Sequence, residues 1–311
     1  MTGPSPQPPV PPLAEALAAG PVVLDGGLSN QLEAAGHDLG DALWSARLLA
    51  EEPEAVVRAH LAYYEAGAQV AITASYQATF EGFARRSTGP EETAALLRRS
   101  VTLAREAASR ARADGVPGPL YVAASAGPYG AMLADGSEYR GRYGRSVDEL
   151  ERFHRPRLEV LAAARPDVLA LETVPDADEA RALLRAVRGL GVPAYLSYSV
   201  AGDRTRAGQP LDEAFGYAAD ADEVIAVGVN CCAPDDADRA VRIAARVTGK
   251  PVVVYPNSGE RWDATARAWC GSPAFRADRV AGWVADGARL IGGCCRVGPD
   301  AIAELAAALG R

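Results

Sequence analysis

Two adjacent cysteines near the C-terminal end are the first candidates for chemistry. They stand in the stretch Ile291-Gly292-Gly293-Cys294-Cys295-Arg296, in a chain that has only five cysteines. Neighbouring side chains of a regular strand point to opposite faces, so this pair can face one target only if the strand has already ended. The two glycines favour such a break because glycine adopts backbone conformations that other residues resist. Together with Cys231, the pair predicts a zinc site.

Three thiolates on Zn²⁺ leave one tetrahedral position open, which is typical of catalytic rather than structural zinc. Two other interpretations stay open at this point. Cys232 or Cys270 would close the site as a fourth ligand, or the cysteines are simply small core residues, since free cysteine buries readily. An odd number of cysteines with two vicinal pairs is a poor framework for disulfide bonds.

Short apolar runs predict the strands that would position these cysteines. Most of the runs are continuously apolar, as parallel strands covered on both faces are, and most alternate with helical segments. Eight strands are expected, at residues 22–27, 70–75, 120–126, 168–171, 194–199, 224–230, 251–255 and 289–291. This alternation predicts an α/β protein of one domain, a (β/α)8 TIM barrel, with a doubly wound open sheet as the alternative.

Helical segments and loops complete the predicted domain. Helices are expected at residues 13–19, 29–35, 42–50, 53–65, 90–113, 146–164, 176–189, 211–219, 234–247 and 275–286, with a last helix from residue 298. Ser146 and Glu149 form a capping box after a long polar loop at residues 129–145. Loops of this length are often functional. The proline-rich residues 1–12 are predicted to be a disordered tail, and residues 13–311 form the barrel.

Polar residues follow most of the predicted strands, and a barrel of this kind has its active site at the carboxyl ends of its strands. These residues are Asp25, Thr73, Ser75, Ser125, Glu172, Ser199, Asn230, Cys231, Asn257, Ser258, Cys294 and Cys295. The sixth and eighth strands flank the seventh, so their ends lie about 10 Å apart and side chains from both can meet at one ion. Asp25 and Glu172 either bind an ammonium group with charge-assisted hydrogen bonds, or each pairs with an internal arginine or caps a helix.

The three histidines, His37, His60 and His154, fall away from the strand ends. We therefore interpret them as surface or packing residues. A metal hydrolase would normally use histidine and carboxylate ligands, so this position of the histidines disfavours a hydrolase.

Charge and hydropathy exclude several classes of partner. The 32 basic and 40 acidic residues give a net charge of −8, whereas nucleic acids and anionic membranes need a basic surface. No apolar run approaches the roughly 20 residues of a membrane span. The N-terminal stretch lacks the basic and apolar regions of a signal peptide, and we expect a cytoplasmic protein.

Several motifs resemble those of the homocysteine S-methyltransferase family. The sequences Gly228-Val229-Asn230-Cys231 and Gly292-Gly293-Cys294-Cys295 are similar to the two zinc motifs of that family. Further similar stretches are Leu24-Asp25-Gly26-Gly27-Leu28, Ala74-Ser75-Tyr76-Gln77-Ala78-Thr79, Gly127-Pro128-Tyr129-Gly130-Ala131, Leu171-Glu172-Thr173 and Tyr255-Pro256-Asn257-Ser258-Gly259-Glu260. The resemblance covers nearly the whole chain, from about residue 20 to residue 308.

The resemblance implies a zinc-dependent barrel and assigns roles to its residues. The zinc ligands would be Cys231, Cys294 and Cys295, and the carboxylates that bind the amino-acid substrate would be Asp25 and Glu172. A hydroxyl of Thr73 or Ser75 would hold the substrate carboxylate, with backbone amides nearby. The remaining substrate contacts expected from the family are Gly26, Gly27, Asn230 and Asn257.

The implied reaction moves a methyl group from a sulfonium donor to the thiol of homocysteine and yields methionine. The loop at residues 134–141 is similar to the branch that uses S-methylmethionine or S-adenosylmethionine, and the betaine-dependent branch is the poorer match. The expected partners are therefore small molecules. A non-catalytic zinc or redox-sensing barrel, with a reversible disulfide between Cys294 and Cys295, is the alternative from another class.

Overall fold

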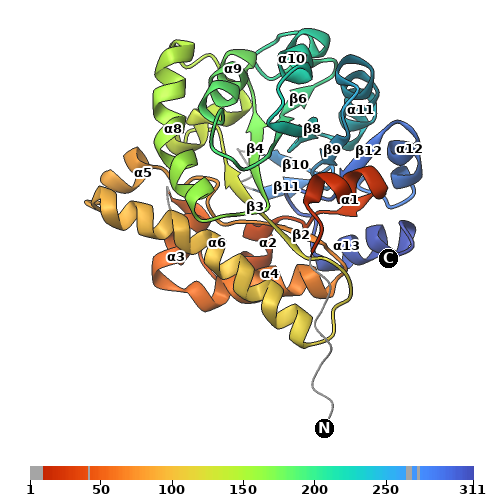
Figure 1. Cartoon of the computed structure of the whole chain (residues 1–311), viewed down its shortest axis with the longest axis horizontal. Coiled ribbons are helices and arrows are strands. Elements are labelled where there is room, and N and C mark those ends of the chain that lie inside the picture. Colours follow the sequence, from red (N-terminus) through yellow and green to blue (C-terminus); the bar gives the residue numbers. More distant parts are fainter. Residues whose placement is uncertain (1–9, 41–42, 264–267, 272–273) are drawn as a thin grey trace.

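The computed structural model describes residues 10–40, 43–263, 268–271 and 274–311. Eight parallel strands form its centre, in the order β1-β12-β9-β8-β5-β4-β3-β2. Their bounds are β1 Val22–Val23, β2 Val70–Ile72, β3 Tyr121–Ala126, β4 Val168–Val174, β5 Ala194–Tyr198, β8 Val224–Asn230, β9 Val252–Tyr255 and β12 Ala288–Ile291. Figure 1 shows the helices arranged around these strands.

The two outer members of that order, β1 and β2, also meet and close the ring. Leu24 forms a parallel bridge with Val70. The backbone N–H of Asp25 donates to Val70 O over 3.0 Å, and that of Gln69 donates to Val23 O over 2.8 Å. The predicted (β/α)8 barrel is confirmed, and the open-sheet alternative is wrong, because an open sheet would leave these edge groups unpaired.

Helices cover the outside of the barrel and bury one apolar face each against the strands. The longer ones are α4 Pro53–Glu65, α6 Pro90–Ala113, α8 Val147–Ala163, α9 Ala177–Ala186, α10 Leu211–Ala219, α11 Pro234–Thr248 and α13 Pro299–Ala308. Shorter segments are α1 Leu13–Ala19, α2 Leu28–Ala34, η1 Trp44–Arg47, α3 Leu48–Glu51, α5 Phe80–Ala84, α7 Tyr129–Leu133, η2 Ser137–Tyr139 and α12 Arg279–Ala285. In the described residues, no helix is both long and apolar enough to cross a membrane.

The barrel interior is filled by side chains that alternate along the strands, as inward-facing positions should. Val22 and Leu24 from the first strand region pack with Tyr121 and Ala123 of β3 in one buried cluster. Two leucines of α1 join the same cluster, and Figure 1 shows this helix lying across one end of the barrel. The cavity described below therefore lies at the other end, where the strands finish.

The structure differs from the sequence predictions mainly in the loops. The expected unstructured loop at 129–145 contains α7 and η2, and the expected helix at 42–50 consists of η1 followed by α3. The short helix α5 and the hairpins β6–β7 (Val200–Ala201, Arg204–Thr205) and β10–β11 (Arg261–Asp263, Ala268–Cys270) were not predicted. The predicted disordered tail lies outside the described residues up to position 9, as do residues 41 and 42.

The predicted start of the helix at Ser146 agrees with the structure, whereas the predicted end of the fourth strand does not. The Ser146 hydroxyl accepts from Glu149 N over 3.2 Å, and the Glu149 carboxylate accepts from Ser146 N over 2.8 Å, so the capping box forms. Strand β4 continues to Val174 rather than ending at Leu171. The extension contains a shift of register toward β5, with Thr173 in a left-handed conformation at φ 57°.

Candidate active site

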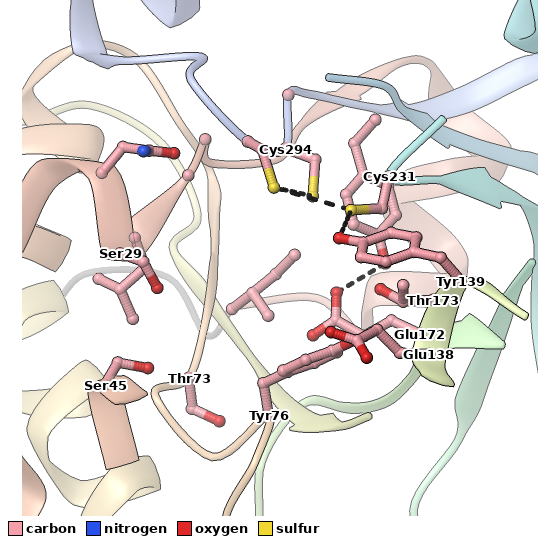
Figure 2. Close-up of a pocket in the computed structure, with 18 residues that line it drawn as sticks. Ser29, Ser45, Thr73, Tyr76, Glu138, Tyr139, Glu172, Thr173, Cys231 and Cys294 are labelled. Carbon is pink, nitrogen blue, oxygen red and sulfur yellow. Dashed lines mark hydrogen bonds between the residues drawn. The ribbon is translucent and has the colours of Figure 1, made fainter. Parts of the chain in front are cut away.

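A cavity at the carboxyl ends of the strands brings together residues from most of the chain. Figure 2 shows the sulfur atoms, several hydroxyls and two carboxylates among the side chains that line it. The lining residues are Gly26, Gly27, Leu28, Ser29, Asn30, Ser45, Ile72, Thr73, Tyr76, Glu138, Tyr139, Glu172, Thr173, Cys231, Tyr255, Gly293, Cys294 and Cys295.

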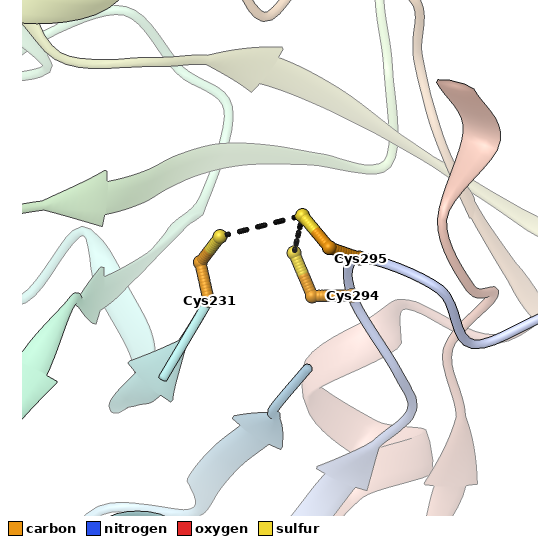
Figure 3. Close-up of side chains that lie close together, drawn as sticks. All are labelled: Cys231, Cys294 and Cys295. Atoms are coloured by element: carbon orange, nitrogen blue, oxygen red, sulfur yellow. Dashed lines mark hydrogen bonds between the residues drawn. The ribbon is translucent and has the colours of Figure 1, made fainter. Parts of the chain in front are cut away.

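The three predicted ligand cysteines form one cluster in the cavity wall (Figure 3). The sulfur atoms of Cys231, Cys294 and Cys295 all lie within 4.8 Å of one another. The separation is 3.7 Å between Cys231 and Cys295 and 4.0 Å between Cys294 and Cys295. Thiolates that share a tetrahedral ion at about 2.3 Å lie about 3.8 Å apart, so the cluster fits a metal ion of that kind.

The other two cysteines do not belong to this group in the described part of the chain. Cys232 is fully buried, and burial raises the pKa of its thiol. Cys270 is exposed at the end of β11. The structure therefore gives a three-cysteine site with an open side rather than a closed four-cysteine site.

Cys231 is aimed at its partners by an unusual backbone conformation directly after β8. Its φ is 50°, a left-handed value that is uncommon for residues other than glycine. The turn is held by Cys231 N, which donates to Tyr255 O over 3.3 Å, and by Ser199 Oγ, which donates to Cys231 O over 3.2 Å. Strain of this sort persists where surrounding contacts enforce it, commonly at functional sites.

Cys294 and Cys295 follow the end of β12, and the loop after β9 fixes their direction. Cys294 N donates to Pro256 O over 2.8 Å, and Cys295 N donates to Asn257 Oδ1 over 3.2 Å. Asn257 N in turn donates to Cys232 O over 2.9 Å. Asn257 therefore connects the two cysteine motifs and does not itself line the cavity, although we expected it to contact the substrate.

The glycines before the vicinal pair serve close packing rather than an unusual φ. A Cβ at Gly292 would lie 2.5 Å from Leu24 Cβ, and one at Gly293 would lie 2.1 Å from Val297 Cγ1. Neither glycine is among the residues with positive φ. Gly26 and Gly27 line the cavity and are equally confined, since a Cβ there would lie 2.1 Å from Val297 O and 2.7 Å from Cys294 O respectively.

Glu172 is a buried carboxylate that faces the cavity. Ser125 Oγ donates to Glu172 Oε1, and the Tyr255 hydroxyl donates to Oε2 over 3.0 Å. Burial raises the pKa of Glu172 to about 7, and these two hydrogen bonds oppose that rise. The side chain is therefore fixed in direction and titrates near neutral pH.

Asp25 lies beneath the cavity wall and is not among the lining residues. It is fully buried, and its Oδ2 accepts from Ile72 N over 2.8 Å. Its Oδ1 is buried without a hydrogen-bond partner among the described residues. Burial holds the pKa of Asp25 well above its usual value. The predicted pair of carboxylates therefore occupies two depths, with Glu172 at the cavity and Asp25 at the junction of the first two strands.

Of the two hydroxyls expected to hold the substrate carboxylate, those of Thr73 and Ser75, only one lines the cavity. Thr73 lines the cavity, and its Oγ1 accepts from Ser125 N over 3.0 Å. Ser75 lies behind it, 2.7 Å from Thr73 Oγ1 between the two hydroxyl oxygens, and donates to Ser125 O over 2.8 Å. Thr73 is therefore the hydroxyl that can reach a ligand.

Asn230 also supports the wall from behind. Its amide nitrogen donates to Thr173 Oγ1 over 2.7 Å, and its Oδ1 accepts from Thr173 N and from Ser197 Oγ, each over 2.7 Å. These bonds hold Thr173 in its left-handed conformation beside Glu172. Asn230, like Asn257, fixes the position of a neighbour and does not line the cavity.

Several lining residues were not predicted from the sequence. Tyr139 is the most informative, because its hydroxyl lies 3.1 Å from Cys231 Sγ although 92 residues separate the two in the chain. Glu138 precedes it, and Tyr76 completes this part of the wall. The sequence signals were the length of the loop at 129–145 and the family resemblance of residues 134–141 and 74–79, and these signals give no direction for individual side chains.

The cluster favours a thiolate at Cys231. Hydrogen bonds from the Cys294 and Cys295 thiols lower the pKa of Cys231, and the Tyr139 hydroxyl acts in the same direction. The histidines take no part. His60 and His154 are fully buried in helices, as expected for packing residues, and His37 Nδ1 lies 3.6 Å from the Glu52 carboxylate near the surface.

Sequence comparisons give consistent relatives. A family model described as homocysteine S-methyltransferase matches residues 22–309. Homocysteine S-methyltransferase 4 of Zea mays is 46% identical over 309 residues, which span 94% of this chain and 90% of that protein. The homocysteine S-methyltransferase of Escherichia coli (strain K12) is 45% identical over 295 residues, spanning 92% and 94% of the two chains.

Structure comparisons agree with these relatives. The homocysteine methyltransferase MmuM from Escherichia coli in its metallated form aligns with a TM-score of 0.87 and 43% identity, over 96% of this chain and 99% of that one. Its oxidized form aligns with a TM-score of 0.84 and 44% identity, over 92% and 95%. The predicted family and its enzyme class are thus confirmed: the chain belongs to the homocysteine S-methyltransferase family.

Proposed function

We propose that this protein transfers a methyl group from a sulfonium donor, S-methylmethionine or S-adenosylmethionine, to the thiol of homocysteine, giving methionine. The observation that carries the proposal is the three-sulfur cluster in the wall of a cavity that also exposes the Glu172 carboxylate. The sulfur cluster can bind a metal ion that in turn binds a substrate thiol, and the Glu172 carboxylate can bind an ammonium group. Homocysteine carries both a thiol and an ammonium.

We propose zinc as the metal because three thiolates are a typical zinc ligand set. Cys231, Cys294 and Cys295 would hold it. Bound zinc supplies a Lewis-acidic position at which a substrate thiol loses its proton at neutral pH and stays nucleophilic. The protein then needs no general base of its own for that proton.

The side chains of the cavity orient the two substrates. Glu172, fixed by Ser125 and Tyr255, pairs with the homocysteine ammonium. The Thr73 hydroxyl would turn its proton from Ser75 Oγ to the homocysteine carboxylate. The homocysteine sulfur attacks the donor methyl carbon, the new S–C bond forms as the donor S–C bond breaks, and the bonding pair returns to the donor sulfur. Holding the reactants in line is the main contribution of the protein.

A methyl-transfer assay tests this function directly. Purified protein loaded with zinc is mixed with homocysteine and one methyl donor in each of three reactions. The donors are S-methylmethionine, S-adenosylmethionine and betaine, and methionine is measured. We expect methionine with a sulfonium donor and at least about tenfold less with betaine. Absence of methionine with every donor would refute the proposal and favour the non-catalytic, redox-sensing alternative.

A further inference from the structure

One charged side chain of the cavity has no part in the reaction as described above. Glu138, in the short helix η2, lines the cavity, and Figure 2 shows it among the other lining side chains. Its Oε2 atom is buried and has no hydrogen-bond partner among the described residues. A buried carboxylate oxygen without a partner is costly, so a cationic or donating ligand would stabilise it.

The segment that carries Glu138 is held closely from both sides. A Cβ on Gly130 would lie 2.5 Å from Glu138 N, so α7 and η2 are in direct backbone contact. Within the segment, Ser137 N donates to Asp135 Oδ1 over 2.9 Å, and Gly141 N donates to Ser137 O over 2.9 Å. These contacts give Glu138 a defined position before any ligand arrives, which is the condition for a built binding site.

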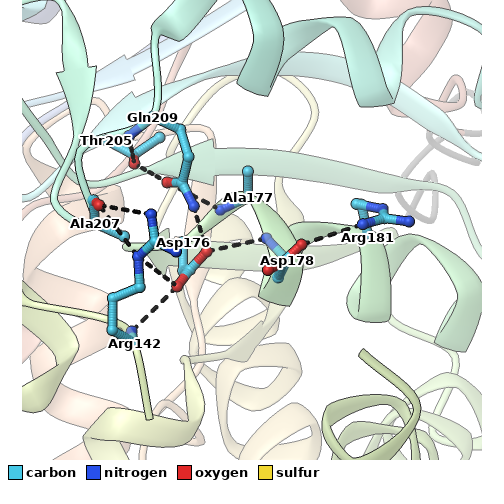
Figure 4. A network of polar contacts seen from close by, with 8 residues as sticks. All are labelled: Arg142, Asp176, Ala177, Asp178, Arg181, Thr205, Ala207 and Gln209. Atoms are coloured by element: carbon cyan, nitrogen blue, oxygen red, sulfur yellow. Dashed lines mark hydrogen bonds and ion pairs between the residues drawn. The ribbon is translucent and has the colours of Figure 1, made fainter. Parts of the chain in front are cut away.

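The far end of the same segment is anchored to the barrel by the network in Figure 4. Arg142 N donates to Asp176 Oδ2 over 3.1 Å, and the Arg142 guanidinium donates to Ala207 O over 3.2 Å. Gln209 Nε2 donates to Asp176 Oδ1 over 2.6 Å. The wall that carries Glu138 and Tyr139 is therefore tied to the segments that follow β4 and β5.

Two amino-acid substrates would bring two ammonium groups into one cavity that has two lining carboxylates, Glu138 and Glu172. Glu172 already accepts hydrogen bonds on both oxygens and suits the acceptor, whereas Glu138 keeps one oxygen unused. On the basis of the proposed function, we infer that Glu138 binds the α-ammonium of the methyl donor and thereby selects amino-acid sulfonium donors.

The choice of the ammonium over the sulfonium follows from how charge changes in the reaction. The sulfonium charge disappears as the methyl group leaves, so a carboxylate placed against it would stabilise the ground state more than the transition state. The ammonium charge persists throughout. A carboxylate bound to it holds the donor in place without opposing the reaction.

The same contact gives discrimination between donors. A donor without an N–H-bearing ammonium would bury Glu138 without a hydrogen-bond donor. Betaine, whose quaternary ammonium has no N–H, and dimethylsulfoniopropionate, which has no ammonium, are such donors. Sites with a buried polar group reject ligands that leave it unpaired more strongly than they reject ligands that differ by a methylene. Glu138 would therefore determine which class of donor binds, while the metal site of the three cysteines and Glu172 would bind homocysteine.

The test compares two sulfonium donors in the full-length, zinc-loaded protein. S-methylmethionine has an α-ammonium, and dimethylsulfoniopropionate does not. We expect Glu138→Gln to lower kcat/KM for S-methylmethionine at least about tenfold, because a charge-assisted hydrogen bond is lost. For dimethylsulfoniopropionate, we expect no fall in kcat/KM or, if turnover is slow, no rise in its inhibition constant, because this donor leaves Glu138 unpaired. The KM for homocysteine and the zinc content should stay unchanged.

Asp135→Asn is the matched control, because it removes one negative charge from the same segment at an exposed position and keeps an oxygen for Ser137 N. It should leave both donors unaffected. An unchanged kcat/KM for S-methylmethionine in Glu138→Gln would overturn the inference, and so would equal losses with both donors. If Glu138→Gln loses zinc or stability, Glu138→Asp replaces it, and an equal effect of that variant on both donors again overturns it. Failure of the wild-type protein to transfer methyl groups from any donor would instead refute the proposed function.

Discussion

At the scale of single residues, the chemistry of the site depends on three sulfur atoms and one carboxylate. The sulfurs come from two segments 64 residues apart, between Cys231 and Cys295, yet their separations suit one metal ion. The vicinal pair would supply two of the three proposed ligands, so the loss of either member would leave a set too small for tight binding of zinc.

We predict that Cys294→Ser loses zinc and methyl transfer together, because a serine hydroxyl is a poor replacement for a thiolate ligand. Metal content by elemental analysis and a methionine assay on the same sample check this. Cys232→Ala is the control, since Cys232 is buried outside the cluster, and it should keep about one zinc per chain. A zinc-free Cys294→Ser protein with full activity would contradict the role of the metal.

Glu172 gives a prediction about pH. Its pKa of about 7 is raised from the ordinary value by burial, so the side chain is largely neutral at pH 6 and ionised at pH 8. An ammonium binds the ionised form, and the ratio of wild-type to Glu172→Gln affinity for homocysteine should therefore rise as the pH passes through about 7 and then level off. Glu172→Gln should weaken homocysteine binding about tenfold or more at pH 8 and by less at pH 6.

Calorimetric titration of both proteins with homocysteine at the two pH values measures this ratio. Ionisation of the substrate thiol affects both proteins equally and cancels in the comparison. A ratio of wild-type to variant affinity that does not grow with pH would count against an ionised Glu172 on the ammonium.

At the scale of elements, the site is made by the ends of strands and by the loops that hold them. The ends of β8 and β12 supply the cysteines, and the loop after β9 joins them through Asn257. The strand extension after Leu171 carries Glu172 and the left-handed Thr173, which Asn230 fixes from the neighbouring β8. Asn230 and Asn257, which we expected to contact the substrate, thus orient neighbouring residues that line the cavity.

The glycines of the second cysteine motif give a prediction at this scale. Gly293→Ala would place a Cβ 2.1 Å from Val297 Cγ1, so the backbone before the cysteines has to move. We expect a loss of about 1–3 kcal/mol in the free energy of unfolding, together with weaker zinc binding. Denaturant titration and competition with a zinc chelator measure the two effects.

Gly298→Ala is the control, because nothing lies within 4 Å of a Cβ at that position and its φ of −89° suits alanine. It should change the free energy of unfolding by less than about 1 kcal/mol and leave zinc affinity unchanged. Equal effects of the two substitutions would show that close packing at Gly293 is not what constrains the motif.

At the scale of the whole molecule, a bound ion would tie the barrel together across three adjacent strands. Its ligands follow β8 and β12, which are separated by β9 in the ring. Binding to the folded state alone stabilises that state by mass action, by about 4 kcal/mol when free metal is a thousandfold above the dissociation constant.

We therefore predict that removal of zinc by a chelator lowers the Tm of the wild-type protein and that added zinc restores it. Differential scanning calorimetry with and without chelator measures the shift. Cys294→Ser should show no such shift, which separates metal binding from any general effect of the chelator. A wild-type Tm that is indifferent to the metal would argue against a site that joins the two segments.

The sequence alone determined the barrel, its family and which three cysteines meet in one cluster. Continuous apolar runs separated by helices specify parallel strands, and the order of such strands in a closed ring leaves little freedom, so the meeting of Cys231 with Cys294 and Cys295 could be predicted. Glu172 and Thr73 were expected at strand ends for the same reason, and both line the cavity.

Only the tertiary structure decided the depth and direction of the remaining side chains. Asp25 and Asn230 stand at strand ends as expected, yet their side chains lie behind the cavity wall, because one residue of register or one left-handed turn reverses the face that a side chain occupies. Glu138 and Tyr139 belong to a loop, where no periodicity relates sequence position to direction. Their place beside Cys231 depends on long-range contacts such as those of Gly130 and Asp176, which the local sequence does not encode.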